Sequence, residues 1–262
     1  MSANRTMLAA WSLLAREWLR FVRQRNRILG ALGTPLLFWV FFGSGFGSSI
    51  HPPGSVERID YMTWFFPGAL LLVILFTAIF SSISIIEDRN AGFLQGVLVA
   101  PVPRLAIVLG KVLGGATLGA AQGLLLLPLA PLTGIALDAG TVLTIAGELL
   151  LISVTLSALG FLFAWRMDSI QGFHAVMNLL LFPMWLLSGA FFPDSAASGW
   201  LRVLMTVNPL TYGLAALRAA LGDPAKLAEL GVPGAGLSLV VLALVASAMI
   251  VLAAWAARQP EV

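Results

Sequence analysis

Residues 87–111, EDRNAGFLQGVLVAPVPRLAIVLGK, form a charged and proline-containing stretch between two long apolar runs. Charges at the density of residues 87–89 are costly in hydrocarbon, so we expect residues 87–104 to lie in water. Within this loop, residues 91–100 have room for two to three helical turns. The proline at position 101 ends such a helix, because the residue before a proline is disfavoured in the helical region. The stretch therefore predicts a short helix outside the bilayer, held between two membrane-crossing segments.

The composition predicts an all-α integral membrane protein. Of the 262 residues, 59% are hydrophobic and only 10% are charged, and the mean hydropathy is +0.95; a water-soluble domain is far less apolar. There is no cysteine, which excludes disulfides and thiolate metal sites. The net charge is +3, but six of the fifteen Lys and Arg residues lie in the first 27 positions. That distribution is typical of a cytoplasmic membrane flank, and we expect no nucleic-acid partner.

Six apolar runs are long enough to cross a bilayer, for which about 20 residues are needed. A single transmembrane domain is therefore expected over residues 28–262. Placing both termini in the cytoplasm leaves only four of the Lys and Arg residues outside, so this orientation is favoured. The expected spans lie near residues 28–50, 63–86, 105–131, 141–165, 170–192 and 235–257.

The N-terminal segment 1–27 is predicted to form an amphipathic helix at the membrane interface. Apolar side chains at helical spacing lie opposite a stripe of arginines that includes Arg16, Arg20 and Arg23. Such a helix places aromatic residues in the headgroup region of the lipid. Its arginines can face anionic lipid or a protein partner, and the pattern is compatible with both.

Two further patterns bear on the fold: a ladder of glycines in the third expected span, and a region with two short apolar segments before the last span. The ladder, at intervals of about four in the third span, allows close approach of another helix; the residues leave open whether this lies within one chain or between subunits. Residues 193–234 hold two apolar segments, 200–207 and 210–221, each too short to cross the membrane. They predict a re-entrant or outer-leaflet helical hairpin before the last span. The ladder comprises Gly110, Gly114, Gly115, Gly119 and Gly123.

Few residues are candidates for chemistry. Glu148 is an acid well inside a predicted span. It either contacts the substrate on the translocation path or is a protonated, hydrogen-bonded residue that helps subunits pack. Arg166 and Asp168 lie in a very short inner loop, which is either a plain turn or a second contact with a cytoplasmic partner. Gly110 and Lys111 are followed by valine, so no phosphate-binding loop is present, and Lys111 is expected to extend to the headgroups. No pattern of catalytic or metal-ligating residues is recognisable.

The 87–111 stretch resembles the first cytoplasmic loop of the membrane subunits (permeases) of type 2 ABC exporters, of the daunorubicin-resistance and nodulation-export kind. A second stretch, Gly189 to Pro193 followed by Asn208, Pro209, Leu210, Thr211, Tyr212 and Arg218, resembles that family's outer-face segment. Phe93 and Gln95 depart from the family pattern, which usually has threonine and glutamate there. By this resemblance, a set of residues in the first loop is expected to contact a partner subunit. These residues are Glu87, Asp88, Arg89, Gly92, Phe93, Leu94, Pro101 and Arg104.

The resemblance implies that the short helix is a coupling helix, which docks on a separate ATP-binding cassette ATPase. ATP and magnesium are then expected in that partner, with no cofactor bound by this chain and no enzymatic activity of its own. A second permease copy or a homologous permease is also expected, in a bacterial plasma (inner) membrane. Glu148, Asn208, Pro209 and Tyr212 are the candidate residues of the translocation path or outer gate.

The apolar spans favour a hydrophobic or amphiphilic cargo, drug-like or lipid-like. Two alternatives remain open on the sequence. One is export of a polysaccharide or lipid-linked glycan, and the other is a non-transporting scaffold that recruits a cytoplasmic ATPase.

Overall fold

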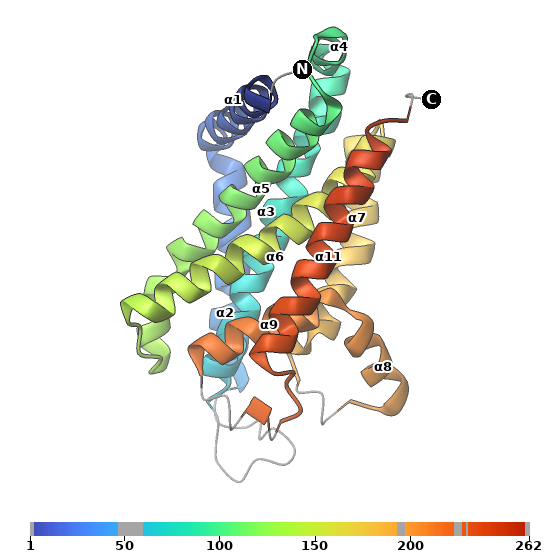
Figure 1. Ribbon diagram of the computed structural model, residues 1–262. Coiled ribbons are helices and arrows are strands. Elements are labelled where there is room, and N and C mark those ends of the chain that lie inside the picture. The colour runs from blue at the N-terminus through green and yellow to red at the C-terminus, as the bar shows by residue number, and fades with distance from the viewer. Residues whose placement is uncertain (1–2, 47–59, 193–196, 223–226, 229, 260–262) are drawn as a thin grey trace.

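In the computed structural model, the chain is a bundle of long helices with shorter helices at both ends (Figure 1). The structure describes residues 3–46, 60–192, 197–222, 227–228 and 230–259. Within these residues all regular secondary structure is helical, as the composition predicts. Both termini and α4 lie at one end of the bundle, called here the terminal end, and α8 and α9 lie at the opposite end.

Six helical segments are long and apolar enough to cross a membrane, which agrees with the six expected spans. Two of them end in tighter or wider turns: α5 continues into the 3₁₀ segment η1, and α7 continues into the π segment η2. The helices of the spans are α2 (Arg25–Phe46), α3 (Tyr61–Asn90), α5 (Arg104–Leu126) with η1 (Leu127–Thr133), α6 (Ala139–Arg166), α7 (Ile170–Trp185) with η2 (Leu186–Ala190), and α11 (Ala235–Ala256). The last residues of the expected 28–50 span, and parts of the expected 193–234 hairpin, lie outside the described residues.

Helix α3 occupies the centre of the bundle. In its most apolar window 89% of the residues are buried, against 22% in each of α2, α7 and α11. It packs against α2, α5, α6, α7 and α9. The sequence is compatible with this position, because α3 is apolar on all sides from Phe65 to Leu75 and has no polar face there that would need water.

The ends of α3 differ from the expectation in one respect. The apolar run ends at Ile86, but the helix continues through the charged residues 87–89 to Asn90. The helix continues because these side chains find partners on neighbouring helices, and so the charges do not force the backbone into a loop. The helix therefore extends over residues 87–90 into the predicted loop 87–104.

The glycine ladder of α5 is used for packing within this chain. A Cβ atom on Gly110 would lie 2.6 Å from Cβ of Leu13 and 2.9 Å from the Ala10 carbonyl oxygen, both in α1 (Ala3–Arg23). On another side of α5, a Cβ on Gly119 would lie 2.8 Å from Oγ of Ser153 in α6. The small residues thus let α1 and α6 approach the α5 backbone closely.

Two short helices, α8 (Gly199–Val207) and α9 (Pro209–Leu221), form at the predicted positions of the opposite end. Asn208 joins them: its side-chain oxygen accepts a hydrogen bond from the Leu210 amide and its Nδ2 donates to the Met184 carbonyl. Pro209 then occupies the first position of α9, where a proline is well tolerated. This turn chemistry fixes the angle between the two helices and anchors them to α7.

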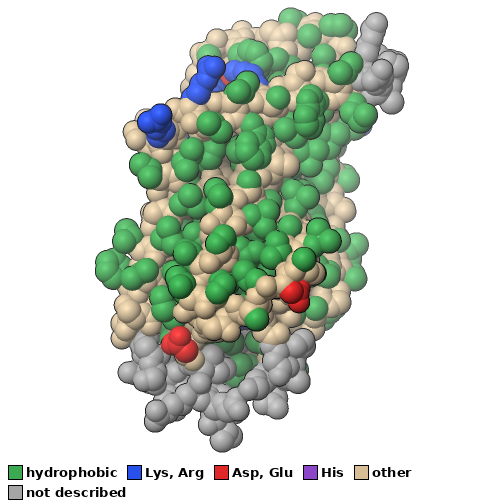
Figure 2. Space-filling view, turned by 90° about the vertical axis from the view of Figure 1, so that its left-hand side faces the viewer, with side chains coloured by type: hydrophobic (Ala, Val, Ile, Leu, Met, Phe, Trp, Pro, Cys, Tyr) green, Lys and Arg blue, Asp and Glu red, His purple; other side chains and the backbone are tan. Residues whose placement is uncertain are grey.

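The surface shows how the bundle meets its surroundings. On the face in Figure 2, hydrophobic side chains cover the middle, and the basic side chains in view lie near the end that carries α1. Large apolar residues are exposed along the spans, such as Leu37, Leu179 and Leu244. This distribution is that of a protein whose middle is covered by lipid.

Candidate functional site

The candidate site is built around α4 (Phe93–Val99), the short helix between α3 and α5 at the terminal end (Figure 1). Gly92 precedes it with φ of +72°, a left-handed conformation that glycine adopts without strain. This residue turns the chain out of α3. Leu94 is buried and anchors α4 on the bundle, whereas Val99 is 86% exposed. The helix expected over residues 91–100 is therefore present, with an apolar anchor on one side and an open surface on the other.

Asp88 lies directly below α4 and gathers three cations. Arg16 approaches it with two nitrogens, at 2.6 and 2.7 Å, and Arg20 lies at 3.0 Å. Lys111 of α5 donates to the same carboxylate and to Glu17 of α1, at 2.6 Å for the latter. The hydrogen bonds that Arg16 donates to the Asp88 carboxylate raise the pKa of Arg16 above its ordinary value. This cluster ties α1, α3 and α5 together with hydrogen-bonded charges, as buried charges require.

Glu87 of α3 forms a second link, to the beginning of α2 and to α1. Its Oε1 atom accepts a 2.6 Å hydrogen bond from Arg27, at the beginning of α2, and Arg20 lies 3.6 Å from its Oε2 atom. The two acids of the predicted contact set are thus paired within the chain.

Three features of this network are not predicted by the sequence: the participation of Glu17, that of Arg27, and the true role of Lys111. Lys111 does not extend to the headgroups; it is buried, with its amine between two carboxylates. Glu17 offered a signal, because it is the only acid before position 57 and lies in a strongly basic helix. Such an acid indicates a buried cation nearby.

Arg89 connects the beginning of the α4 segment to the short loop between α6 and α7. It donates hydrogen bonds to the carbonyl oxygens of Trp165 (2.6 Å) and Met167 (2.8 Å), and it lies 3.3 Å from Asp168. The side chain of Asp168 is 89% exposed, and Arg166 is exposed as well. The structure therefore brings the predicted contact in the first loop close to the predicted second contact, Arg166 and Asp168, at the terminal end.

Arg104 fastens the other side of the α4 segment. It donates a 2.7 Å hydrogen bond to the Ala257 carbonyl oxygen just after α11. Pro101 lies between α4 and α5, where the backbone is extended rather than helical. The segment 87–104 is thus attached at both ends to helices that are distant in the sequence.

An apolar groove lies between α1 and α4. Its volume is about 430 Å³ and its lining includes Leu13, Phe93, Gly96 and Val97. The ring of Phe93 is covered on one side by the guanidinium of Arg16, whose carbon lies 3.7 Å from the ring centre. Phe93, one of the two residues that depart from the family pattern, therefore contributes both to the groove and to the contact between α4 and α1.

The N-terminal arginines are divided between two roles. Arg16 and Arg20 point toward α3 and are occupied by Asp88 and Glu87, whereas Arg23 is exposed. The residues of α1 that face outward are largely apolar, including Met7 and Trp11. The helix therefore exposes an apolar face, as an interfacial helix does, but it uses two of its arginines to hold itself on the bundle.

The residues predicted for the opposite end have structural partners. Asn208 and Pro209 form the α8–α9 corner, and the Tyr212 hydroxyl donates a 2.9 Å hydrogen bond to the Thr206 carbonyl. Glu148 lies in α6, is buried, and its Oε2 atom has no hydrogen-bond partner among the described residues.

Comparisons with known proteins agree with this architecture. Residues 9–221 match the family described as ABC-2 type transporter. The chain is 27% identical over 216 residues to the inner membrane transport permease YadH of Escherichia coli, covering 80% of this chain and 82% of that protein. It is 26% identical over 208 residues to the putative transport permease ycf38 of Cyanophora paradoxa, covering 79% and 71%.

The family match extends over most of the chain and includes α4, the charged cluster below it and the α8–α9 corner. The chain is a multi-pass helical membrane protein and belongs to the ABC-2 type transporter family, as a permease subunit.

Proposed function

We propose that this chain is the membrane-spanning half of an ATP-driven exporter and moves a hydrophobic or amphiphilic substrate out of the cytoplasm or the inner leaflet. The observation that carries the proposal is the geometry of α4. A short helix with an exposed surface is held at one end of the bundle: it packs on α3, its Phe93 stacks on Arg16 of α1, and the residues flanking it bond to the end of α6 and to the end of α11.

The partner would be a separate ATP-binding cassette ATPase, which binds ATP and magnesium. It would contact the open surface of α4, formed by Gln95, Gly96 and Val99, and place an apolar side chain in the groove beside Phe93. Asp168 and Arg166 extend the contact area across the α6–α7 loop. Glu87, Asp88, Arg89 and Arg104 would act indirectly, by holding α4 in position.

The terminal end would then face the cytoplasm, with the chain in a bacterial inner membrane. The name of the Escherichia coli relative supports this location, and the concentration of Lys and Arg at the terminal end supports the orientation. The exposed apolar face of α1 would lie in the inner lipid interface.

Displacement of α4 would move several helices at once. The chain connects α4 directly to α3 and α5, and Arg89 would pass the same movement to the end of α6 through the Trp165 and Met167 carbonyls. Stacking of Arg16 on Phe93 links the movement to α1. A second permease copy, or a homologous permease, would pair with this chain so that a route opens between them. Such a switch requires that the ATPase bind the two states with different affinity.

The apolar surface of the spans supports the substrate class. Large hydrophobic side chains are exposed on α2, α6, α7 and α11, which suits cargo that enters sideways from the bilayer.

The docking proposal is tested with Val99→Asp, which adds a charge to α4 at a position that is 86% exposed. Asn26→Asp adds the same charge to an exposed position at the same end, but outside α4. Each variant is co-expressed with the ATPase of the same transporter, and the amount of ATPase that co-purifies is measured together with ATP hydrolysis. We expect loss of the ATPase only with Val99→Asp. Equal recovery from both variants would contradict docking on α4.

A further inference from the structure

Arg218 is a buried cation at the opposite end of the bundle. It lies in the last turn of α9, is 5% exposed, and donates a 2.8 Å hydrogen bond from Nη2 to the Gly189 carbonyl oxygen. Its guanidinium carbon lies 3.6 Å from the centre of the Trp64 ring. Within the part of the chain that the structure describes, no aspartate or glutamate forms an ion pair with it.

These contacts leave the cation incompletely compensated. A guanidinium has five N–H donors, and the Nε of Arg218 is buried without an acceptor among the described residues. Burying a charge without a counter-charge costs several kcal/mol. Lys111, the other deeply buried cation, has two carboxylates around its amine. Asp223 and Glu229, the acids that follow Arg218 most closely in the sequence, lie outside the described residues, so the counter-charge is either an acid outside the described residues or a bound anion, and the salt dependence measured below separates the two.

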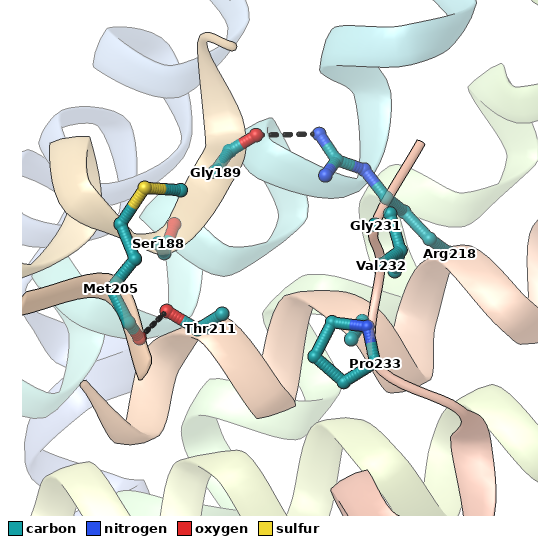
Figure 3. Close-up of a pocket in the computed structure, with 9 residues that line it drawn as sticks. Ser188, Gly189, Met205, Thr211, Arg218, Gly231, Val232 and Pro233 are labelled. Atoms are coloured by element: carbon teal, nitrogen blue, oxygen red, sulfur yellow. Dashed lines mark hydrogen bonds between the residues drawn. The ribbon is translucent and has the colours of Figure 1, made fainter. Parts of the chain in front are cut away.

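A small pocket adjoins the guanidinium (Figure 3). Figure 3 shows Arg218 reaching across one side of it toward Gly189, with Pro233 below. The pocket is lined by the π segment, by α8 and α9, and by residues 231–233 before α11. The two neighbouring hydroxyls already donate elsewhere, Ser188 to the Trp185 carbonyl and Thr211 to the Met205 carbonyl. The unused donor at the pocket is therefore the guanidinium itself.

The size of the pocket restricts the guest. The pocket is narrow: the space open to the centre of a water-sized sphere is about 10 Å³, which favours a single small guest over a phosphate group or a carboxylated molecule. A monatomic anion such as chloride matches both the charge and the size.

We propose that this pocket binds a chloride ion beside Arg218. The ion neutralises the guanidinium and thereby stabilises the junction of η2, α8, α9 and the turn before α11. Gly189 has φ of +91° within η2, so the carbonyl that faces Arg218 belongs to an unusual backbone turn of the kind often found at functional positions. In the proposed orientation the pocket lies on the outer side, where chloride from the medium reaches it, but the binding itself does not depend on that orientation.

The test measures the apparent melting temperature of the full-length chain in detergent, with sodium chloride replaced by sodium gluconate at constant ionic strength. Saturating chloride, about 100-fold above the Kd, is expected to raise the melting temperature by about 5–10 °C. Arg218→Gln is expected to remove this dependence. Arg202→Gln, which removes an exposed arginine of α8 at the same end, is expected to keep it. A wild-type chain that melts at the same temperature in both salts would overturn the proposal, and so would loss of the response in Arg202→Gln.

A second measurement covers the case in which Arg218→Gln does not fold. Crystals of the wild-type chain grown in bromide are expected to give an anomalous peak next to Nε of Arg218. An ordered water at that position without anomalous signal would contradict an anion site. Equal stabilisation by phosphate or by anionic lipid in place of chloride would likewise contradict a monatomic guest.

Discussion

Arg16 holds Asp88 by two parallel contacts, with Nη1 2.6 Å from Oδ2 and Nη2 2.7 Å from Oδ1. This geometry is the strong, orientation-specific form of an ion pair. It fixes α1 against the last turns of α3, immediately before the chain turns into α4. The position of α4 therefore depends on charges that lie beneath it rather than on its own seven residues.

Replacement of Asp88 by asparagine should destabilise the whole terminal end. The change leaves Arg16, Arg20 and Lys111 facing a neutral group, and removal of one partner from a buried ion pair costs roughly 3–5 kcal/mol. Asp168→Asn is the matched control, because that side chain is 89% exposed and exposed substitutions change stability by about 0.5 kcal/mol or less. Thermal unfolding in detergent distinguishes the two, and equal melting temperatures would contradict the role given to Asp88.

Gly92→Ala should alter α4 without disturbing the bundle. A residue with a Cβ atom at φ of +72° is strained by about 1–2 kcal/mol, and the turn out of α3 relaxes to relieve that strain. Gly33→Ala, inside α2 and with open space around it, should be neutral or slightly stabilising. We expect ATP hydrolysis per assembled complex to fall several-fold for Gly92→Ala alone, with both variants inserted normally in the membrane. Unchanged hydrolysis in Gly92→Ala would show that this turn does not position α4.

Gly110→Ala should weaken the contact between α1 and α5. The added methyl group would lie 2.9 Å from the Ala10 carbonyl oxygen, a main-chain atom that moves only if α1 moves. Overpacking of this kind costs about 1–3 kcal/mol. Gly147→Ala in α6 is the comparison, since the methyl group added there would meet no described atom within 4 Å. Melting temperature is again the measurement, and a loss of stability in Gly147→Ala alone would reverse the interpretation.

Arg104→Gln should loosen the end of α11. Without the 2.7 Å hydrogen bond to Ala257, we expect faster amide hydrogen exchange in residues 255–259 and little change elsewhere. Arg258→Gln removes an exposed cation in the same segment and serves as the control. Similar exchange in the wild-type chain and Arg104→Gln would show that this bond does not hold the terminus.

The absence of cysteine permits a direct test of the proposed orientation. Val99→Cys in α4 and Val207→Cys in α8 place single thiols at positions that are 86% and 77% exposed. In intact cells a membrane-impermeant maleimide should label only Val207→Cys, and it should label Val99→Cys after permeabilisation. The reverse pattern would place α4 outside and would exclude docking of a cytoplasmic ATPase there.

The helical spans were predictable because their apolar length is a physical requirement of the bilayer. The short helix α4 was also predictable, since Pro101 limits it on one side and the charges of residues 87–89 limit the apolar run on the other. The same charges misplaced the end of α3, because hydropathy describes the cost of an isolated charge and contains no information about Arg16, Arg20 and Arg27 on other helices.

Most of what could not be predicted concerns contacts between side chains that are distant in the sequence. Lys111 and Glu17 are 94 positions apart, and only the packing of α1 on the glycines of α5 brings them to 2.6 Å. Arg218 was placed by its motif in the outer-face segment, but its burial against Trp64 follows from the way α3 and α9 meet. A linear pattern gives the residue type and its helix, and the partner depends on the fold.

The central position of α3 has a consequence for transport. Because α3 is buried along most of its length among the other described helices, side chains fill the axis of the bundle. Under the proposed function, cargo would therefore pass along the outside of the bundle, with the second wall of the passage supplied by another molecule.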